Sequence, residues 1–373
     1  MRYKLGEIFE VGSGGTPSKN HPEYYGGSIP WIKTGDLKCE YLYGAEDYIT
    51  EEGVNNSSAK MYAPDTVLIA MYGATIGATS ILKIDACTNQ ACAAFKKSEK
   101  VIPEYLYYFF KSQKERFVKD GVGGAQPNIS AGYLKNVEME VPTLERQTEI
   151  VDILDKVNRI IEQRETELEE LDNLIKSRFV EMFGDPDVNE KGWKMNTFGD
   201  ICTVRQGLQI PISKRLMEYE EDCYEYITVA YLHGGKEREY IKSPKATVVC
   251  TKDDVLMTRT GNTGMVITGV EGVFHNNFFL IDFDRTKYDK EFLVQYLNLD
   301  MIQADIIRRA GTSTIPDLNH GEFYKIKIFE PPINLQTEFN AFVHQVTKLK
   351  FEVQKSLDET QTLMDSLMQQ YFG

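Results

Sequence analysis

Cysteine is scarce in this sequence: there are six in 373 residues, and no two of them form a Cys-x-x-Cys pair. The five histidines are scattered at positions 21, 233, 275, 320 and 344, and none stands with cysteine at zinc-ligand spacing. These absences exclude a disulfide scaffold and the usual kinds of zinc site. We therefore expect a reduced chain without a bound metal ion, in which each histidine has a packing or surface role.

Long apolar runs are missing as well. No uninterrupted stretch approaches the roughly 18–20 residues that a transmembrane helix requires. The opening segment, residues 1–7, has a basic pair but no apolar stretch behind it, so it does not have the pattern of a signal peptide. We expect a cytoplasmic protein with no membrane partner.

Positive charge is in deficit, because 42 basic side chains face 56 acidic ones and the formal net charge is −14. A free-standing nucleic-acid-binding protein usually carries a strongly basic surface, so the overall charge argues against that class. The deficit is uneven: residues 1–144 carry 15 basic and 17 acidic groups, whereas residues 185–333 carry 18 and 23. Local basic patches are therefore expected on the first block, and less easily on the later one.

Several catalytic motifs are also absent. The sequence has no Gly-x-x-x-x-Gly-Lys-Ser/Thr loop, no Gly-x-Ser-x-Gly elbow, no His-Glu-x-x-His helix and no Asn-Pro-Pro-Tyr/Phe of adenine methyltransferases. No Glu/Asp-x-Lys follows Pro64-Asp65, Pro186-Asp187 or Pro316-Asp317 at nuclease spacing. The glycine-rich stretches at 12–15, 73–77 and 121–124 are interpreted as turns. The sequence thus points to recognition rather than catalysis.

An internal repeat organises the chain. Phe183-Gly184 recurs 189 residues later as Phe372-Gly373, and three single residues recur at that same spacing. Those three pairs are Gln147 with Gln336, Pro142 with Pro331, and Pro127 with Pro316. Earlier in each half, the run from Gly6 is answered by the run from Gly199, 193 residues on. A collinear set of this kind indicates an ancient duplication.

Each half ends in a segment with apolar residues at heptad spacing, over residues 145–184 and 334–373, which predicts two long helices. Pro142 and Thr143 are suited to begin the first helix, and Gly184-Asp185-Pro186 is suited to end it. In the first helix the expected seam comprises Ile150, Leu154, Val157, Ile161, Leu168, Leu171, Ile175 and Met182. In the second it comprises Phe339, Phe342, Val346, Leu349, Val353, Thr360, Met364 and Leu367.

A helix of about 40 residues is roughly 60 Å long and cannot bury its apolar stripe alone. We expect the two helices to pair as an antiparallel coiled coil between two globular blocks, although each stripe could instead cover the core of its own block. The blocks read as mixed, strand-rich structure, with strands at 66–70 and 254–257 and short helices at 105–110 and 292–297. The predicted class is α+β, with two tandem mixed α/β domains at 1–144 and 185–333 and internal pseudo-two-fold symmetry.

The motifs of the first half then suggest a family. They are Gly14-Gly15-Thr16-Pro17-Ser18, Ile29-Pro30-Trp31-Ile32-Lys33-Thr34-Gly35-Asp36-Leu37, Gly73-Ala74-Thr75-Ile76-Gly77, Asn89-Gln90-Ala91, Gln126-Pro127-Asn128-Ile129-Ser130 and Val141-Pro142 with Gln147. The whole chain resembles the specificity subunit of type I restriction-modification enzymes. The second half departs from the pattern, because residues 259–264 and 311–316 replace the Gly-Ala-Thr-Ile-Gly and Gln-Pro-Asn runs.

The resemblance implies a non-catalytic reader of double-stranded DNA. Each globular block would be a target-recognition domain for one half of a bipartite target, and the helices would be a spacer and a docking surface for two methyltransferase subunits. Those subunits would bring S-adenosylmethionine and methylate adenine at N6, and restriction and translocase subunits would use ATP and Mg²⁺. No cofactor is expected on this chain. Because the blocks differ in sequence, the target should be asymmetric, with a gap set by the length of the helices.

Polar and basic residues on predicted loops are the candidates for DNA contact. In the first block they are Ser13, Thr16, Ser18, Lys19, Lys33, Thr34, Tyr72, Gln126 and Asn128. In the second they are Arg205, Gln206, Gln209, Lys214, Arg215, Arg259, Asn262, Thr312 and Ser313. Lys33 and Arg259 are the preferred pair. Shared motif residues such as Gly73, Gly77 and Asn128 could equally hold loops common to readers of different targets.

Two other interpretations remain open at this point. The chain could be a coiled-coil adaptor that bridges proteins without binding DNA, which the net charge of −14 mildly favours. It could also be a specificity subunit in a methylation-based phage-defence system that lacks the usual nuclease. The acidic run at 162–170 is interpreted as a solvated helix face, with partner docking as the alternative.

Overall fold

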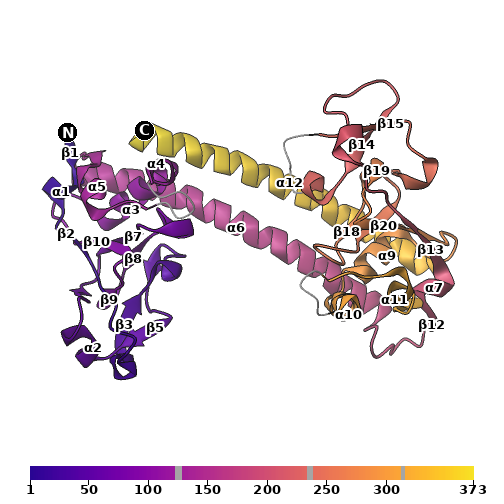
Figure 1. Cartoon of the computed structure of the whole chain (residues 1–373), viewed down its shortest axis with the longest axis horizontal. Helices are drawn as coiled ribbons and strands as arrows, with labels where there is room; N and C mark the ends of the chain where they lie inside the picture. The colour runs from indigo at the N-terminus through magenta and orange to yellow at the C-terminus, as the bar shows by residue number, and fades with distance from the viewer. Residues whose placement is uncertain (122–127, 233–237, 312–315) are drawn as a thin grey trace. The chain divides into compact units, whose positions relative to one another are not determined.

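The computed structural model describes residues 1–121, 128–232, 238–311 and 316–373. The chain divides into two compact units. Unit 1 contains residues 1–165 and 355–373, and unit 2 contains residues 166–354. The two long helices, α6 (Leu144–Phe183) and α12 (Ile333–Phe372), therefore contribute a segment to each unit (Figure 1).

The described residues of unit 1 form three sheets. Strand β1 (Arg2–Lys4) pairs with β11 (Glu138–Glu140), and the larger sheets have the orders β2-β10-β7-β8-β4 and β5-β3-β9-β6. The strands of the first order are β2 (Val11–Ser13), β10 (Cys92–Phe95), β7 (Val67–Ala70), β8 (Thr79–Leu82) and β4 (Tyr41–Leu42). Those of the second are β5 (Asp47–Ile49), β3 (Tyr25–Ile32), β9 (Ala86–Thr88) and β6 (Met61–Tyr62). The shorter helices are α1 (Leu5–Ile8), α2 (Glu51–Asn55), α3 (Pro103–Ser112), α4 (Lys114–Asp120) and α5 (Ala131–Asn136).

Unit 2 repeats this plan. Strand β12 (Lys194–Thr197) pairs with β21 (Lys327–Glu330), and the larger sheets have the orders β13-β20-β17-β18 and β15-β14-β19-β16. The strands of the first order are β13 (Cys202–Gln206), β20 (Phe278–Phe283), β17 (Val255–Thr258) and β18 (Val266–Ile267). Those of the second are β15 (Tyr240–Lys242), β14 (Cys223–Ile227), β19 (Gly272–Phe274) and β16 (Val249–Cys250). The shorter helices are α7 (Phe198–Ile201), α8 (Val229–Leu232), α9 (Lys290–Leu297), α10 (Asp300–Ala310) and α11 (His320–Phe323).

The central strand of each unit is buried on both faces. Because side chains alternate along a strand, Val67 and Ile69 of β7 join the cluster that contains the aromatic residues of α3, whereas Leu68 faces a second cluster. In β17, Val255 and Met257 join the cluster of α9, and the residue between them faces the other way. The short apolar runs with no polar alternation are thus explained by burial from two sides.

The long helices pack against each other within each unit. In unit 1, the cluster that contains Ile150, Leu154 and Ile161 of α6 also contains Met364 of α12. In unit 2, Phe179 of α6 lies with its ring centroid 5.4 Å from that of Phe339 at the start of α12. The start of α6 thus meets the end of α12 in one unit, and the reverse holds in the other. The predicted α+β class with an antiparallel helix pair is confirmed.

The ends of α6 follow from capping. The backbone N–H of Arg146 donates to Thr143 Oγ1 at 3.3 Å, which satisfies one of the free donors of the first turn. Gly184 adopts a φ of +85° and its N–H donates to the carbonyl of Val180 at 2.8 Å. A residue with a side chain is strained in that conformation, so glycine is suited to close the helix.

The predicted seam needs one correction on α12. Leu349 is 55% exposed, whereas Val343, which the heptad reading left out, is buried. The seam therefore follows 339, 343, 346, 350 and 353, and position 350 is a lysine whose ammonium pairs with Asp172 of α6. A lysine can pack its aliphatic stem while its charge reaches an acidic partner, so the polar residue concealed the phase of the repeat. The remaining seam positions are buried or partly buried: Ile150, Leu154, Val157, Ile161, Leu168, Leu171, Ile175, Met182, Phe339, Phe342, Val346, Val353, Thr360, Met364 and Leu367.

Candidate nucleic-acid interface

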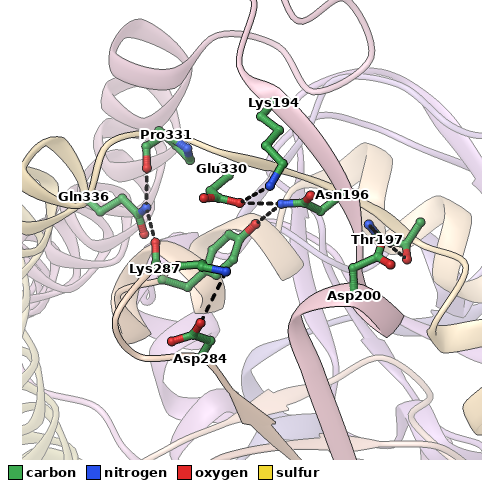
Figure 2. Close-up of polar contacts among 10 residues, drawn as sticks. Lys194, Asn196, Thr197, Asp200, Asp284, Lys287, Glu330, Pro331 and Gln336 are labelled. Atoms are coloured by element: carbon green, nitrogen blue, oxygen red, sulfur yellow. Dashed lines mark hydrogen bonds and ion pairs between the residues drawn. The ribbon is translucent and has the colours of Figure 1, made fainter.

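A buried glutamine joins each globular block to its long helix. Gln147 Oε1 accepts from the N–H of Ile102 at 3.0 Å, and its Nε2 donates to the carbonyls of Lys100 and Pro142 at 2.8 and 3.0 Å. Gln336 bonds Asp289, Lys287 and Pro331 in the same way, at 2.8, 2.9 and 2.7 Å; Figure 2 shows its amide between the latter two carbonyls. The two glutamines that are equivalent in the sequence repeat therefore make equivalent hydrogen bonds in the structure.

The edge strands of the two units are fixed in matching ways. The N–H of Leu5 donates to the carbonyl of Val137 at 2.9 Å, and that of Phe198 donates to Ile326 at 2.9 Å. In unit 2 the β12–β21 pair carries an added polar cluster, in which Asn196 Nδ2 donates to Glu330 and Lys194 pairs with the same carboxylate (Figure 2). These contacts hold the frame on which the candidate loops stand.

Two loops meet at the end of the central strand in each unit. An isolated antiparallel bridge joins Tyr72, just after β7, to Asn128, and the N–H of Ile129 donates to the carbonyl of Met71 at 3.0 Å. The matching bridge in unit 2 joins Thr260 to Asp317. There the N–H of Leu318 donates to the carbonyl of Arg259 at 2.9 Å. The backbone is thus the same at both places, while the side chains that it presents differ.

The loops that follow β2 in unit 1 and β13 in unit 2 each require a glycine. A Cβ on Gly14 would lie 1.7 Å from the carbonyl oxygen of Thr88, and one on Gly207 would lie 2.3 Å from that of His275. No side chain fits at these distances, so both loops pass directly over a neighbouring backbone segment. This close approach places Gly14 and Gly207 against the ends of β9 and β19.

In the first block, the candidate residues divide by their contacts. Thr16 Oγ1 donates to Gln90 Oε1 at 2.5 Å, which links the Gly-Gly-Thr-Pro and Asn-Gln-Ala motifs. Lys33 forms an ion pair with Asp47, and hydrogen bonding to that carboxylate raises the pKa of the lysine. Ser18, Lys19, Tyr72 and Asn128 are exposed, Ser13 and Thr34 are partly buried, and Gln126 lies outside the described residues.

In the second block, Arg215 is held inside the unit. Its guanidinium donates to both carboxylate oxygens of Glu239 at 3.1 and 3.0 Å, donates to the carbonyl of Ile210 at 2.8 Å, and lies over the ring of Tyr226. This side chain, 16% exposed, has a structural role in the free protein. Arg205 is also engaged, because its Nη1 donates to the carbonyl of Thr247 at 3.2 Å.

Arg259 forms a bidentate ion pair with Asp317. Its Nε and Nη2 donate to the two carboxylate oxygens at 2.9 and 2.8 Å. His320 lies nearby: burial lowers its pKa, and the charge of Arg259 lowers it further. The other candidates Gln206, Gln209, Lys214 and Asn262 are exposed, and Thr312 and Ser313 lie outside the described residues.

The sequence reading missed three partners of the candidate residues, namely Asp47, Gln90 and Asp317. Gln90 lies within the Asn89-Gln90-Ala91 motif, and Asp317 occupies the place of Asn128 in the repeat. Asp47 had no signal, because its contact with Lys33 depends on the pairing of β3 with β5.

The described residues contain no group of three or more histidine, cysteine, aspartate or glutamate side chains placed to hold a metal ion. Among the helices of the described ranges, none is both long and apolar enough to cross a membrane.

Comparison with known proteins places this duplicated fold in a family. The model of the type I restriction modification DNA specificity domain matches residues 1–173 and 190–360. The MjaIX type I restriction enzyme specificity subunit of Methanocaldococcus jannaschii is 27% identical over 397 aligned positions, which cover 98% of this chain and 90% of the relative. A specificity subunit from Escherichia coli is 33% identical over 162 positions, which cover 42% of this chain and 40% of the relative.

Solved structures share the fold. The S subunit of the type I restriction-modification system of M. genitalium aligns with a TM-score of 0.56 at 15% identity, covering 100% of this chain and 96% of that one. A chain from a structure of type I R-M complex assembly aligns with a TM-score of 0.62 at 15% identity, covering 100% and 97%. From the two matched ranges, the chain belongs to the type I restriction modification DNA specificity family.

Proposed function

We propose that this chain is the sequence-specific DNA-binding subunit of a type I restriction-modification complex. Its two globular blocks read the two halves of one asymmetric, gapped target. Partner subunits carry out adenine N6 methylation and restriction, and this chain itself is non-catalytic. S-adenosylmethionine and ATP with Mg²⁺ belong to those partners.

One observation carries the proposal: the two units share a hydrogen-bonded frame but present different side chains from it. Tyr72 and Asn128 in unit 1 correspond to Thr260 and Asp317 in unit 2, on the same backbone bridge. A shared frame that presents different side chains is what two readers of different sequences require, since groove edges are distinguished by the side chains that reach them.

The net charge of −14 is consistent with this function if phosphate contacts are shared with partner subunits on the same duplex. Helices α6 and α12 each run without a break over 40 residues. In the proposed complex these helices fix the gap between the half-sites and provide a docking surface for two methyltransferase subunits. Lys19 and Lys214, both exposed, supply phosphate contacts from the chain itself.

The proposal is tested by selection from a library of random DNA duplexes. The chain is assembled with a type I methyltransferase subunit, and bound duplexes are recovered at about 0.15 M salt, where weak nonspecific contacts are screened. Enrichment of one asymmetric motif with a constant gap supports the proposal. An assembled, active complex that enriches no motif contradicts it.

A further inference from the structure

The Arg259–Asp317 pair distinguishes unit 2 from unit 1. The equivalent positions in unit 1 are Met71 and Asn128, as the matching backbone hydrogen bonds from Ile129 and Leu318 establish. Neither methionine nor asparagine can form a bidentate ion pair. Any role of the Arg259–Asp317 ion pair therefore belongs to the second block and has no equivalent at these positions of the first.

The pair is rigidly held by the backbone on both sides. The N–H of Arg259 donates to the carbonyl of Asn277 at 2.7 Å, and its carbonyl accepts from the N–H of Leu318 at 2.9 Å and from Thr263 Oγ1 at 3.2 Å. Asp317 is fixed in turn, because its N–H donates to the carbonyl of Ala310 at 3.2 Å. The side chain of Arg259 thus begins at a hydrogen-bonded backbone position and ends on the carboxylate of a residue whose backbone is also hydrogen-bonded.

The two bonds to Asp317 use one side of the guanidinium. They consume the Nε hydrogen and one hydrogen of Nη2, which form the lateral edge of the group. A guanidinium has five N–H donors in one plane, so the second hydrogen of Nη2 and those of Nη1 remain. Within the described parts of the chain these remaining donors have no hydrogen-bond partner. One hydrogen of Nη1 and the second hydrogen of Nη2 are parallel donors along the terminal edge of the guanidinium.

We infer that Arg259 reads a guanine in the half-site bound by unit 2, with Asp317 as the positioning residue that orients it. This inference rests on the proposed function. In the major groove guanine presents two acceptors, O6 and N7, at the spacing of a guanidinium edge, whereas adenine presents one acceptor and one donor. An edge of two parallel donors therefore matches guanine and no other base.

Charge favours a base over a phosphate as the ligand of this edge. The Asp317 side chain is 48% exposed and sits directly on Arg259, so the pair is close to neutral overall. A phosphate approaching it would be repelled by the carboxylate, whereas a neutral base edge is bound through directed hydrogen bonds. The ion pair with Asp317 weakens the attraction of Arg259 for phosphate and fixes the orientation of its guanidinium, which suits sequence recognition.

The test replaces single guanines of the selected motif by 7-deazaguanine, which lacks the N7 acceptor and still pairs with cytosine. Binding of the wild-type chain with its methyltransferase is measured for each substituted duplex. We expect one guanine, in one half-site only, at which the substitution weakens binding on the order of tenfold. The Arg259→Ala complex should bind the normal and substituted duplexes at that position within about twofold of each other.

Two further variants separate reading from a merely structural role. Arg259→Lys keeps the positive charge but has no edge of parallel donors, so its complex should lose sensitivity to 7-deazaguanine while remaining folded. Asp317→Asn introduces the residue that unit 1 has at the equivalent position 128. It should reduce that sensitivity without changing the binding of the other half-site. A control variant, Lys96→Ala in unit 1, should leave the sensitivity unchanged.

The outcomes are distinguishable. If no guanine of the motif responds to loss of N7, or if the response persists in Arg259→Ala, the inference is overturned while the proposed function stands. If the wild-type complex selects no motif, the proposed function fails and the inference fails with it. A uniform loss of affinity for all duplexes in Arg259→Ala, with equal 7-deazaguanine sensitivity, would assign the side chain to phosphate and also overturn the inference.

Discussion

Gln147 and Gln336 make the same three hydrogen bonds in the two halves of the chain, each accepting one backbone N–H and donating to two carbonyls. Both side chains are fully buried. Each lies in the first turns of a long helix and reaches the segment before a short helix of its globular block. The glutamines therefore set how each block is joined to the helix pair.

Replacing either glutamine by alanine should destabilise its own unit by about 2–4 kcal/mol, because one N–H and two carbonyls are left buried without partners. The free energy of unfolding is measured by urea denaturation, and hydrogen exchange of α3 and α9 shows which unit is affected. Gln163→Ala, at an exposed position of α6, is the matched control and should change stability by less than about 0.5 kcal/mol. Equal effects of Gln147→Ala and Gln163→Ala would contradict the assignment.

The phase of α12 gives a second prediction. Leu349 is 55% exposed, so Leu349→Ala should alter the free energy of unfolding by less than about 0.5 kcal/mol. Phe339 is buried among Phe179 and Phe183, so Phe339→Ala should cost about 3–5 kcal/mol. A loss of 2 kcal/mol or more on Leu349→Ala, of the order expected for a buried leucine, would restore the phase first read from the sequence.

Much of the fold was predictable because single residues that recur at a constant spacing reveal the duplication. The spacing of 189 residues predicts that Gln147 and Gln336 are equivalent, and the helix predicted at 145–184 begins and ends within one residue of α6. Apolar periodicity over ten turns is a strong signal, since a register error would expose the whole stripe. The seam predicted for α12 was wrong at Leu349, which is exposed, and left out Val343, which is buried. Lys350, which stands where an apolar residue would have marked the phase, concealed the true repeat.

The candidate site was less predictable, since its contacts join residues distant in the sequence. Arg259 was selected for its charge and its loop, but the sequence held no sign that Asp317 would occupy one edge of it. Arg215 was chosen on the same grounds and is instead engaged with Glu239 and Tyr226. Composition and motif position do not reveal which cations already have a partner inside the unit.

Lys19 provides a test of the first block, since it is exposed in the loop that follows the Gly-Gly-Thr-Pro motif. Lys19→Ala should weaken binding and reduce the dependence of log affinity on log salt concentration by about 1, as expected for loss of one phosphate contact. Lys96→Ala is the control, since that lysine pairs with Glu10 just beyond the opposite end of β10 from Gln90. Binding is measured by fluorescence anisotropy at several salt concentrations. An unchanged affinity and salt slope in Lys19→Ala would remove Lys19 from the interface.

Unit 2 should lose stability as the pH falls. Burial lowers the pKa of His275, as does the charge of Arg215, and the same two causes, burial and Arg259, lower that of His320. The unfolded chain then binds more protons than the folded one below the ordinary histidine pKa of about 6.5, so the free energy of unfolding falls with pH in that range.

This dependence is measured by urea denaturation at pH values from about 8 to about 5.5, which span the ordinary histidine pKa. The double variant His275→Gln, His320→Gln should show a shallower decline below about pH 6.5, because the groups that gain protons on unfolding have been removed. A decline as steep as that of the wild-type chain would assign the effect to other groups.

The central claim is that this chain gives a methyltransferase its target, and a genome-wide map of N6-methyladenine tests it most directly. Cells that express a type I methyltransferase subunit that assembles with the chain are compared with and without the chain. The account predicts methylation at one asymmetric, gapped motif that appears only when the chain is present. Methylation that is the same in both cells, or absent from both despite an active methyltransferase, would contradict it.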